Sequence, residues 1–276
     1  MKSTHLAVGF RQLALVVLLL AGSGTQPVLS QVIDNNPEEL RIIDVIEHLG
    51  DEIPLQLPFV NSHGDSVTLA GYFNAEKPVM LIFVYYNCPM LCTMVLNGVV
   101  NGMQPIDWLP GKEFQIVTIS IDPRETPKLA SDKKHRYVQS YGRDFDPSGW
   151  AFLTGDSATV KKLAEAIGFS YYYDEKQDIF AHPAVVTLLT PEGVISRYLY
   201  GVEFKPNDLR LGLLEASRGK IGTTMERILL YCYQYDPDAK GYVVFARNVM
   251  KLGGMITLSL VVLLLAALWI KEKIRK

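Results

Sequence analysis

The feature that most restricts the fold of this chain is a run of 19 uncharged residues near its end, Leu252 to Ile270. As a helix, this run would be roughly 28 Å long at about 1.5 Å per residue, which matches the hydrocarbon thickness of a membrane. A buried helix of a soluble protein explains the run poorly, because the run is apolar on every face. We therefore predict a single transmembrane helix over residues 252–270.

The residues that flank this run predict its orientation. Trp269 lies at the end of the run, where interfacial aromatic residues gather, and Lys271–Lys276 holds four basic residues in six. The positive-inside rule makes residues 271–276 a cytoplasmic tail, and the basic residues Arg247 and Lys251 weaken this asymmetry without reversing it. We expect a single-pass protein of the cytoplasmic (inner) membrane, with its globular part on the periplasmic or extracytoplasmic side.

A second apolar segment, near the start of the chain, has the form of a secretory signal. Two basic residues precede the short apolar core Leu13–Ala21, and the small and helix-breaking residues of Gly22–Pro27 follow it. Nine apolar residues are too few to span a membrane comfortably. We predict a signal peptide over residues 1–30, with cleavage near Ser30, and an uncleaved anchor as the alternative.

The composition supports one globular region between these two segments. The chain has 276 residues, a formal net charge of −2, 49% hydrophobic and 20% charged residues. Much of the apolar excess lies in the two ends, so that residues 31–250 have an ordinary globular composition. The near-neutral charge argues against a nucleic-acid-binding protein. Three cysteines and five histidines exclude a disulfide scaffold or a zinc-ribbon array.

The hydrophobic pattern of the middle predicts an α/β fold with a mixed sheet and flanking helices. Pro78–Tyr86 and Phe114–Ile121 are continuous apolar runs typical of buried central strands. A helix is expected after each strand, over Met90–Gly102 and from Pro127 to about Tyr141, where Thr126 is a suitable N-cap. Other expected elements are a helix from Asn36 to Leu49, two short strands between Pro54 and Leu69, a strand Trp150–Leu153, a helix from Asp156 to Ile167, a hairpin of residues 185–189 and 194–200, a helix from Asn207, and a helix Thr223–Tyr233 within a helical juxtamembrane segment, residues 223–251.

A pair of cysteines, Cys88 and Cys92, lies between the first of these buried strands and its helix. Residues four apart share one face of a helix, so both sulfur atoms can reach one point. A helix N-terminus lowers the pKa of a thiol, and the thiolate is the form that exchanges disulfides and binds soft metals such as Cu(I). The two residues are also close enough to oxidise to a disulfide. Two buried apolar cysteines are the alternative interpretation.

His182 is the other candidate for a reactive side chain. It stands just before the strand of residues 185–189, and the following Pro183 favours an extended backbone at His182. A lone histidine is more often structural than functional, so the position alone does not decide its role. His48, His63 and His135 lie in polar contexts and are expected to be solvated.

Two further residues have open interpretations. Asp122 lies at the carboxyl end of a strand, where open α/β sheets place ligands, although it equally suits support of the turn into the next helix. Cys232 is an odd cysteine within an aromatic segment. We expect it to be buried there, and a third thiol near the membrane is the alternative.

These segments together resemble the SCO/SenC family. The resemblance lies in Cys88–Cys92, in Thr118–Pro127 with its Asp-Pro-x-x-Thr-Pro pattern, and in His182 followed by Thr190–Gly193. The three segments occur in the right order and at suitable spacing within roughly Leu49–Gly219. Each segment alone would be weak, and their combination is fairly specific.

The resemblance implies a thioredoxin-like domain, over residues 31–222, in a membrane-tethered copper protein that assists assembly of cytochrome c oxidase. It implies that Cys88, Cys92 and His182 bind copper, either as Cu(I) or as Cu(II). Two thiolates and one imidazole suit this metal. The implied partners are the copper-bearing subunit of the oxidase or another copper chaperone.

The sequence departs from the family pattern at three places. The family usually has Asp directly before its His, whereas this chain has Ala181, with Asp178 four residues before the His. Asp122 and Asp178 therefore stand as possible carboxylate partners for the metal ligands. Pro183 occupies the place of the cis-proline of thioredoxins, and the anchor is C-terminal, whereas many family members have it at the N-terminus.

Two other hypotheses use the same cysteines. In the first, Cys88 and Cys92 are the redox-active thiols of a metal-free, membrane-bound thiol–disulfide oxidoreductase. In the second, they form a structural disulfide in a tethered binding module. We rank the second lowest, because closing so short a loop stabilises a fold only slightly.

Overall fold

The computed structural model describes residues 43–73, 76–88, 90–218, 233–236, 241–244 and 246–275. The predicted signal, residues 1–30, lies outside the described residues, as do Cys232 and nearly all of the helix predicted over Thr223–Tyr233.

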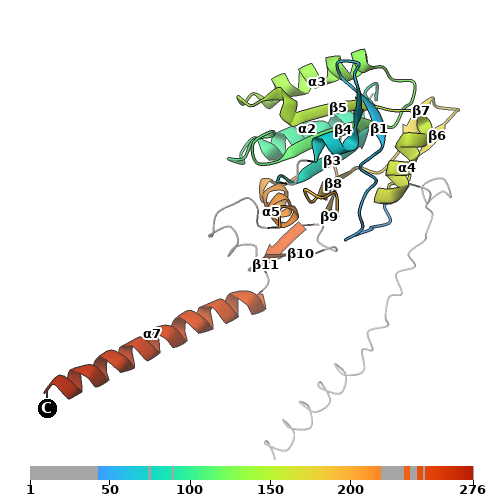
Figure 1. Cartoon of the computed structure of the whole chain (residues 1–276). Coiled ribbons are helices and arrows are strands. Elements are labelled where there is room, and N and C mark those ends of the chain that lie inside the picture. The colour runs from blue at the N-terminus through green and yellow to red at the C-terminus, as the bar shows by residue number, and fades with distance from the viewer. Residues whose placement is uncertain are drawn as a thin grey trace, which may run out of the picture. The chain divides into compact units, whose positions relative to one another are not determined.

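A seven-stranded mixed sheet forms the centre of the fold, with strand order β2-β1-β5-β4-β3-β8-β9 (Figure 1). Strands β3, β4 and β5 are parallel to one another, whereas β1, β8 and β9 pair antiparallel with their neighbours. This sheet confirms the predicted α/β class. The strands are β1 Pro58–Asn61, β2 Ser66–Thr68, β3 Val79–Val84, β4 Gln115–Ser120, β5 Trp150–Thr154, β8 Val185–Leu189 and β9 Ile195–Tyr200.

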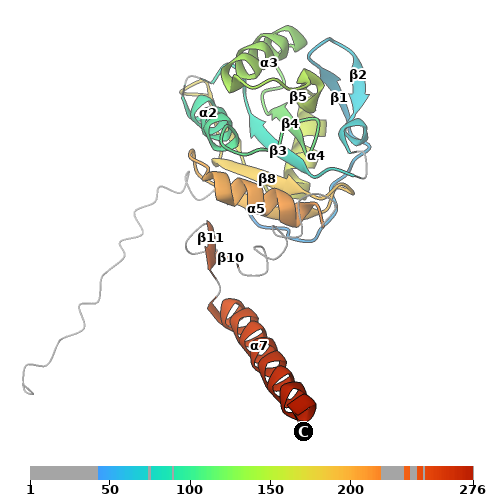
Figure 2. The same ribbon diagram turned by 90° about the vertical axis from the view of Figure 1, so that its left-hand side faces the viewer.

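Helices cover both faces of this sheet. Figures 1 and 2 show α2, α3 and α5 over one face and α4 over the other. The helices are α2 Leu91–Met103, α3 Pro127–Tyr141, α4 Ser157–Ile167 and α5 Pro206–Ala216, with the short 3-10 turns η2 Leu69–Tyr72 and η3 Pro147–Gly149. The predicted caps are in place: Thr126 accepts a hydrogen bond from the N–H of Leu129, and Asp156 accepts one from Thr159.

The core lies around β3, in which all six residues are buried. This burial explains its unbroken apolar sequence, because helices pack on both of its faces. Large aromatic side chains fill the space beside it, including Tyr86 and the fully buried Trp150, whose indole N–H donates to Thr118 Oγ1 over 2.9 Å. Strand β3 is thus a rigid base for the segment that follows it.

Two glycines of α2 allow a close approach of the chain that follows β9. A Cβ atom at Gly98 would lie 2.1 Å from the carbonyl oxygen of Val202, and one at Gly102 would lie 2.5 Å from that of Phe204. A larger residue could not occupy either position without moving the backbone. Because α2 begins at the paired cysteines, this contact also fixes the helix that carries one of them.

The helix predicted from Asn36 to Leu49 is wrong over the part that the structure describes. Residues 43–50 contain no helix. Val45 instead pairs with Phe169, and the N–H of Gly50 donates to the carbonyl of Ile195. Backbone pairing with distant segments has overridden the local helical pattern.

Two hairpins were not predicted. Strands β6 Tyr172–Asp174 and β7 Ile179–Ala181 form a short antiparallel pair directly before His182. Strands β10 Tyr233–Asp236 and β11 Gly241–Val244 form another within the segment that was expected to be helical. Tyr242 ties this second hairpin to α5, because its N–H donates to Asp208 over 3.1 Å.

The C-terminal helix α7 runs from Ala246 to Arg275. Its window Met250–Ala267 has a mean hydropathy of 2.0, and none of this window is buried. Helix α7 therefore has the length and composition of a membrane-spanning helix, and it contains the predicted span of residues 252–270.

Candidate thiol and metal site

The two cysteines lie where the sequence predicted, at the carboxyl end of β3. Cys88 follows this strand, and Cys92 is the second residue of α2. The backbone N–H of Cys92 donates to the sulfur of Cys88 over 3.3 Å, which places the Cys88 sulfur at the N-terminus of the helix. Both are free thiols, and both are buried, with exposed fractions of 8% and 0%. Cys88 and Cys92 therefore lie close together at the start of a helix, as their spacing predicted.

His182 reaches the two cysteines from the neighbouring strand of the sheet, because it precedes β8, which lies beside β3. Its Nε2 atom lies 3.0 Å from the sulfur of Cys92, and the residue is 4% exposed. Strand β8, which follows His182, pairs antiparallel with β3, which precedes Cys88. The sheet therefore brings together two segments that are far apart in the sequence, and all three side chains of the predicted ligand set lie at one place.

The tautomer of His182 follows from its second nitrogen. Nδ1 lies 2.9 Å from the carbonyl oxygen of Pro183, and a carbonyl oxygen only accepts, so Nδ1 carries the proton. Nε2 is therefore the ring nitrogen that faces the sulfur of Cys92, and histidine binds metals through a ring nitrogen that carries no proton. The bond between His182 and Pro183 is trans, unlike the cis-proline of thioredoxins at this place.

The two thiols differ in acidity. A hydrogen bond from the thiol of Cys92 is the main cause that lowers the pKa of Cys88 to about 3. A hydrogen bond with His182 and hydrogen bonds from backbone N–H groups at the helix start also lower this pKa. Burial raises the pKa of Cys92, and its hydrogen bond to Cys88 adds to this. The site thus pairs a thiolate at Cys88, the form that attacks disulfides and binds soft metals, with a protonated thiol at Cys92.

Aromatic side chains surround the site. The ring of Tyr85 lies edge-on to the imidazole of His182, 6.1 Å away, and Phe169 lies 6.0 Å from it on another side. The N–H of Tyr85 donates to the sulfur of Cys92 over 3.4 Å. Burial, and then a hydrogen bond with Cys88, raise the pKa of the Tyr85 phenol. Tyr85 therefore contacts all three candidate ligands.

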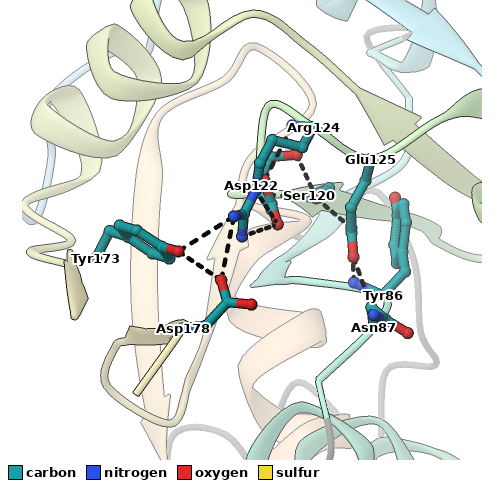
Figure 3. A network of polar contacts seen from close by, with 8 residues as sticks. All are labelled: Tyr86, Asn87, Ser120, Asp122, Arg124, Glu125, Tyr173 and Asp178. Carbon is teal, nitrogen blue, oxygen red and sulfur yellow. Dashed lines mark hydrogen bonds and ion pairs between the residues drawn. The ribbon is translucent and has the colours of Figure 1, made fainter. Parts of the chain in front are cut away.

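Glu125 supports the backbone that leads into Cys88. Its carboxylate accepts hydrogen bonds from the N–H of Tyr86 and of Asn87, over 2.7 and 2.6 Å, and from the hydroxyl of Ser120 over 2.5 Å (Figure 3). Burial raises the pKa of Glu125. The carboxylate thus takes the place of a neighbouring strand for Tyr86 and Asn87, the two residues directly before Cys88.

The two carboxylates proposed as partners of the metal ligands have other contacts. Asp122 is buried, and both of its oxygens accept from the guanidinium of Arg124 over 2.8–3.1 Å. Asp178 is exposed and accepts from Arg124 and from the hydroxyl of Tyr173 (Figure 3). The Nδ1 atom of His182 donates to the carbonyl oxygen of Pro183. Asp122 and Asp178 therefore belong to a network around Arg124.

The donor atoms of the site decide which metal it could hold. Within the residues that the structure describes, no group of three or more His, Cys, Asp and Glu side chains stands as a ready-made metal site. Cys88, Cys92 and His182 are instead joined by hydrogen bonds, in which a proton lies between each pair of atoms. A soft cation that replaced the thiol protons would be bound by two sulfur atoms and one imidazole nitrogen, so the donor set fits Cu(I).

Sequence reasoning missed Arg124, Glu125 and Tyr85. Arg124 and Glu125 do lie within the Asp-Pro-x-x-Thr-Pro segment, where only Asp122 was singled out. Their contacts reach 38 to 54 positions along the chain, so no local pattern signals them.

The chain is similar to known proteins of one family. A family model described as SCO1/SenC matches residues 51–210. A putative electron transfer protein from Aquifex aeolicus VF5 is 29% identical with a TM-score of 0.53, and the match covers 62% of this chain and 95% of that one. A copper-bound structure of Arabidopsis thaliana ScoI is 24% identical with a TM-score of 0.47, covering 59% and 96%. A comparison with curated protein sequences gives no match.

Proposed function

Because the chain belongs to the SCO1/SenC family, we propose that it is a membrane-tethered copper-binding protein that assists assembly of the copper centre of cytochrome c oxidase. Its fold is the thioredoxin-like fold that this family membership implies. In this proposal Cys88, Cys92 and His182 bind the copper ion, which is a cargo passed to another protein.

One observation carries the ligand assignment: Nε2 of His182 lies 3.0 Å from the sulfur of Cys92, and Cys92 in turn contacts the sulfur of Cys88 through its N–H. Two soft sulfur donors and one imidazole nitrogen converge in a buried place. This set suits Cu(I), and with an added ligand it tolerates Cu(II).

The difference in acidity between the thiols orders the binding steps. The Cys88 thiolate, whose pKa is lowered to about 3, is the first donor available to an arriving cation. The charge of the cation then favours loss of the proton from Cys92, which passes to water as the second sulfur bond forms. The lone pair of His182 Nε2 completes the set, while the Pro183 carbonyl holds the ring by its other nitrogen.

The placement in the cell is part of the proposal. Helix α7 has the length of a membrane span, and the basic residues after it favour a cytoplasmic tail over residues 271–276. The globular domain, residues 31–222, would then lie on the extracytoplasmic side, after export by the signal at residues 1–30. The proposed partners are the copper-bearing subunit of the oxidase or another copper chaperone on that side.

A second function is favoured by the unequal thiols alone. A thiolate at Cys88 beside a protonated thiol at Cys92 is the arrangement of an attacking and a resolving cysteine. A metal-free thiol–disulfide oxidoreductase would need this pair and would not need a nitrogen donor at His182. The histidine therefore separates the two functions.

A titration of the reduced, detergent-solubilised chain with Cu(I) tests the proposal. We expect one copper ion per chain, with weaker binding in His182→Ala and greater loss in Cys88→Ser and Cys92→Ser. His135→Ala is the matched control, because this histidine is exposed on α3, and it should bind as wild type does. If the wild-type chain binds no copper but reduces disulfides, and His182→Ala keeps that activity, the oxidoreductase function replaces the one proposed.

A further inference from the structure

Arg124 connects two parts of the molecule on either side of the site. Its Nε and Nη2 atoms bind the buried carboxylate of Asp122, in the loop after β4. Its Nη1 atom donates to Asp178 and to the hydroxyl of Tyr173, each over 3.2 Å, both in the β6–β7 hairpin (Figure 3). A guanidinium has five N–H donors in one plane, so Arg124 can bind Asp122 and the β6–β7 hairpin at the same time.

The hairpin held by Arg124 leads directly into His182. Strand β7 ends at Ala181, so that His182 is the next residue. The guanidinium also lies over the rings of Tyr173 and Phe180, 4.9 and 5.7 Å from their centroids. The ring of Phe180 lies 5.7 Å from that of Tyr85, which contacts His182 and Cys92. A continuous set of contacts therefore runs from Arg124 to the site.

The neighbouring residue, Glu125, holds the opposite segment. Its carboxylate binds the N–H groups of Tyr86 and Asn87, immediately before Cys88. Two consecutive residues of one loop thus hold the chain on the cysteine side and the chain on the histidine side. The distance between the two ligand-bearing segments depends on this loop.

We propose that Arg124 is a positioning residue that clamps the β6–β7 hairpin onto the loop after β4 and thereby sets the place of His182 relative to Cys92. Only the predicted effect on copper affinity rests on the proposed function. The position of His182 relative to Cys92 can be tested in the protein without metal.

The contact between Arg124 and Asp178 is exposed to solvent, which distinguishes a role in positioning His182 from a role in the stability of the whole fold. The side chains of Arg124 and Asp178 are 56% and 76% exposed, and exposed ion pairs add little to the free energy of unfolding. Breaking the contact should therefore loosen the hairpin locally and leave the global unfolding midpoint almost unchanged. The same property makes the test practicable, because the variant should fold.

Asp178→Gly is the sharpest variant. Asp178 has a φ of +52°, which glycine adopts freely, so this change removes the carboxylate and leaves the turn unstrained. It also keeps the pair of Arg124 with the buried Asp122. Asp178→Asn keeps an acceptor oxygen for Arg124 and serves as the conservative rescue. Asp132→Asn is the control, because it removes a charge from another exposed pair, with Lys128.

The readout without metal is the reactivity of His182 toward diethyl pyrocarbonate, measured by peptide mass spectrometry on the detergent-solubilised full chain. His182 is 4% exposed, and the exposed His135 in the same sample is the internal reference. We expect several-fold faster modification of His182 in Asp178→Gly, little change in Asp178→Asn and none in Asp132→Asn. The Cu(I) affinity of Asp178→Gly should fall by roughly 10- to 100-fold, the range for residues that orient metal ligands.

Three outcomes decide the matter. Unchanged His182 reactivity in Asp178→Gly, and in the same variant with Tyr173→Phe added, overturns the clamp, because Arg124 then has neither of its hydrogen bonds to the hairpin. A gain in reactivity that accompanies a lower unfolding midpoint also overturns it, because the effect would then be global. If the wild-type chain binds no copper, the proposed function fails, whereas the reactivity of His182 still supports or overturns the clamp by itself.

Discussion

Nε2 of His182 lies 3.0 Å from the sulfur of Cys92, although 90 positions separate the two residues in the chain. The antiparallel pairing of β3 with β8 produces this contact, since Cys88 and Cys92 follow one of these strands and His182 precedes the other. The site is therefore a product of strand order, and its chemistry depends on hydrogen bonds that hold each segment in place.

The first prediction concerns the acidity of Cys88. Its pKa is lowered from 9.0 to about 3, so it should be a thiolate at every pH above about 3 and lose reactivity only below it. The rate at which iodoacetamide alkylates Cys88 should then be almost flat between mildly acidic and neutral pH. Mass spectrometry of each cysteine peptide measures it, with Cys92 as the slow, protonated comparison. A rate for Cys88 that rises toward pH 9 would contradict the assignment.

The second prediction concerns Glu125. Burial raises its pKa above 4.5, so the folded state holds the proton more tightly than the unfolded state does. Its contribution to stability is therefore greatest at low pH and declines as pH rises through the folded pKa. In Glu125→Gln this slope should disappear. Tyr86 and Asn87 bind different oxygens of Glu125, so the amide turns its NH2 donor toward one of these N–H groups, which should cost about 1–3 kcal/mol at neutral pH. Urea unfolding of both proteins over a pH series measures the two effects, and parallel pH curves would count against the account.

A third prediction follows from the contact of α2 with the chain after β9. In Gly98→Ala the new Cβ would lie 2.1 Å from the Val202 carbonyl oxygen, so the backbone must move, at about 1–3 kcal/mol. Gly71→Ala is the matched control, because nothing lies within 4 Å of its Cβ position. Thermal unfolding of the two variants should differ clearly. Equal melting temperatures would show that α2 does not approach this segment so closely.

A fourth prediction concerns the polar contact inside the core. The indole N–H of Trp150 donates to Thr118 Oγ1, and both residues are fully buried. Thr118→Val keeps the shape and removes the acceptor, which should cost about 1–3 kcal/mol because a buried N–H loses its partner. Denaturant unfolding measures the loss. In the Trp150→Phe background the same change should cost much less, and equal costs in both backgrounds would refute the coupling.

The predictable parts of the fold are those whose sequence signal is local and strong. The apolar runs at β3 and β4 predicted buried strands, and Thr126 and Asp156 predicted helix starts, because both signals act within a few residues. The three-residue strands of the β6–β7 hairpin carry no such signal. Residues 43–50 follow distant backbone partners instead of their own helical pattern.

The candidate site divides in the same way. Cys88 and Cys92 were found from their spacing at a strand end, and His182 became distinctive only through the family resemblance. The roles of Arg124 and Glu125 depend on contacts with segments far along the chain, which a single sequence does not record. Asp122 and Asp178, the possible carboxylate partners of the metal ligands, both accept hydrogen bonds from Arg124, and their role at the metal stays a prediction.

X-ray absorption of the Cu(I)-loaded chain decides whether the proposed copper site exists, because it counts the sulfur and nitrogen atoms bound to the metal. We predict two sulfur donors, from Cys88 and Cys92, and one imidazole nitrogen, from His182. In His182→Ala the nitrogen contribution should vanish while the two sulfur donors remain. A wild-type spectrum without two sulfur donors, or one that His182→Ala leaves unchanged, would contradict the proposed copper site.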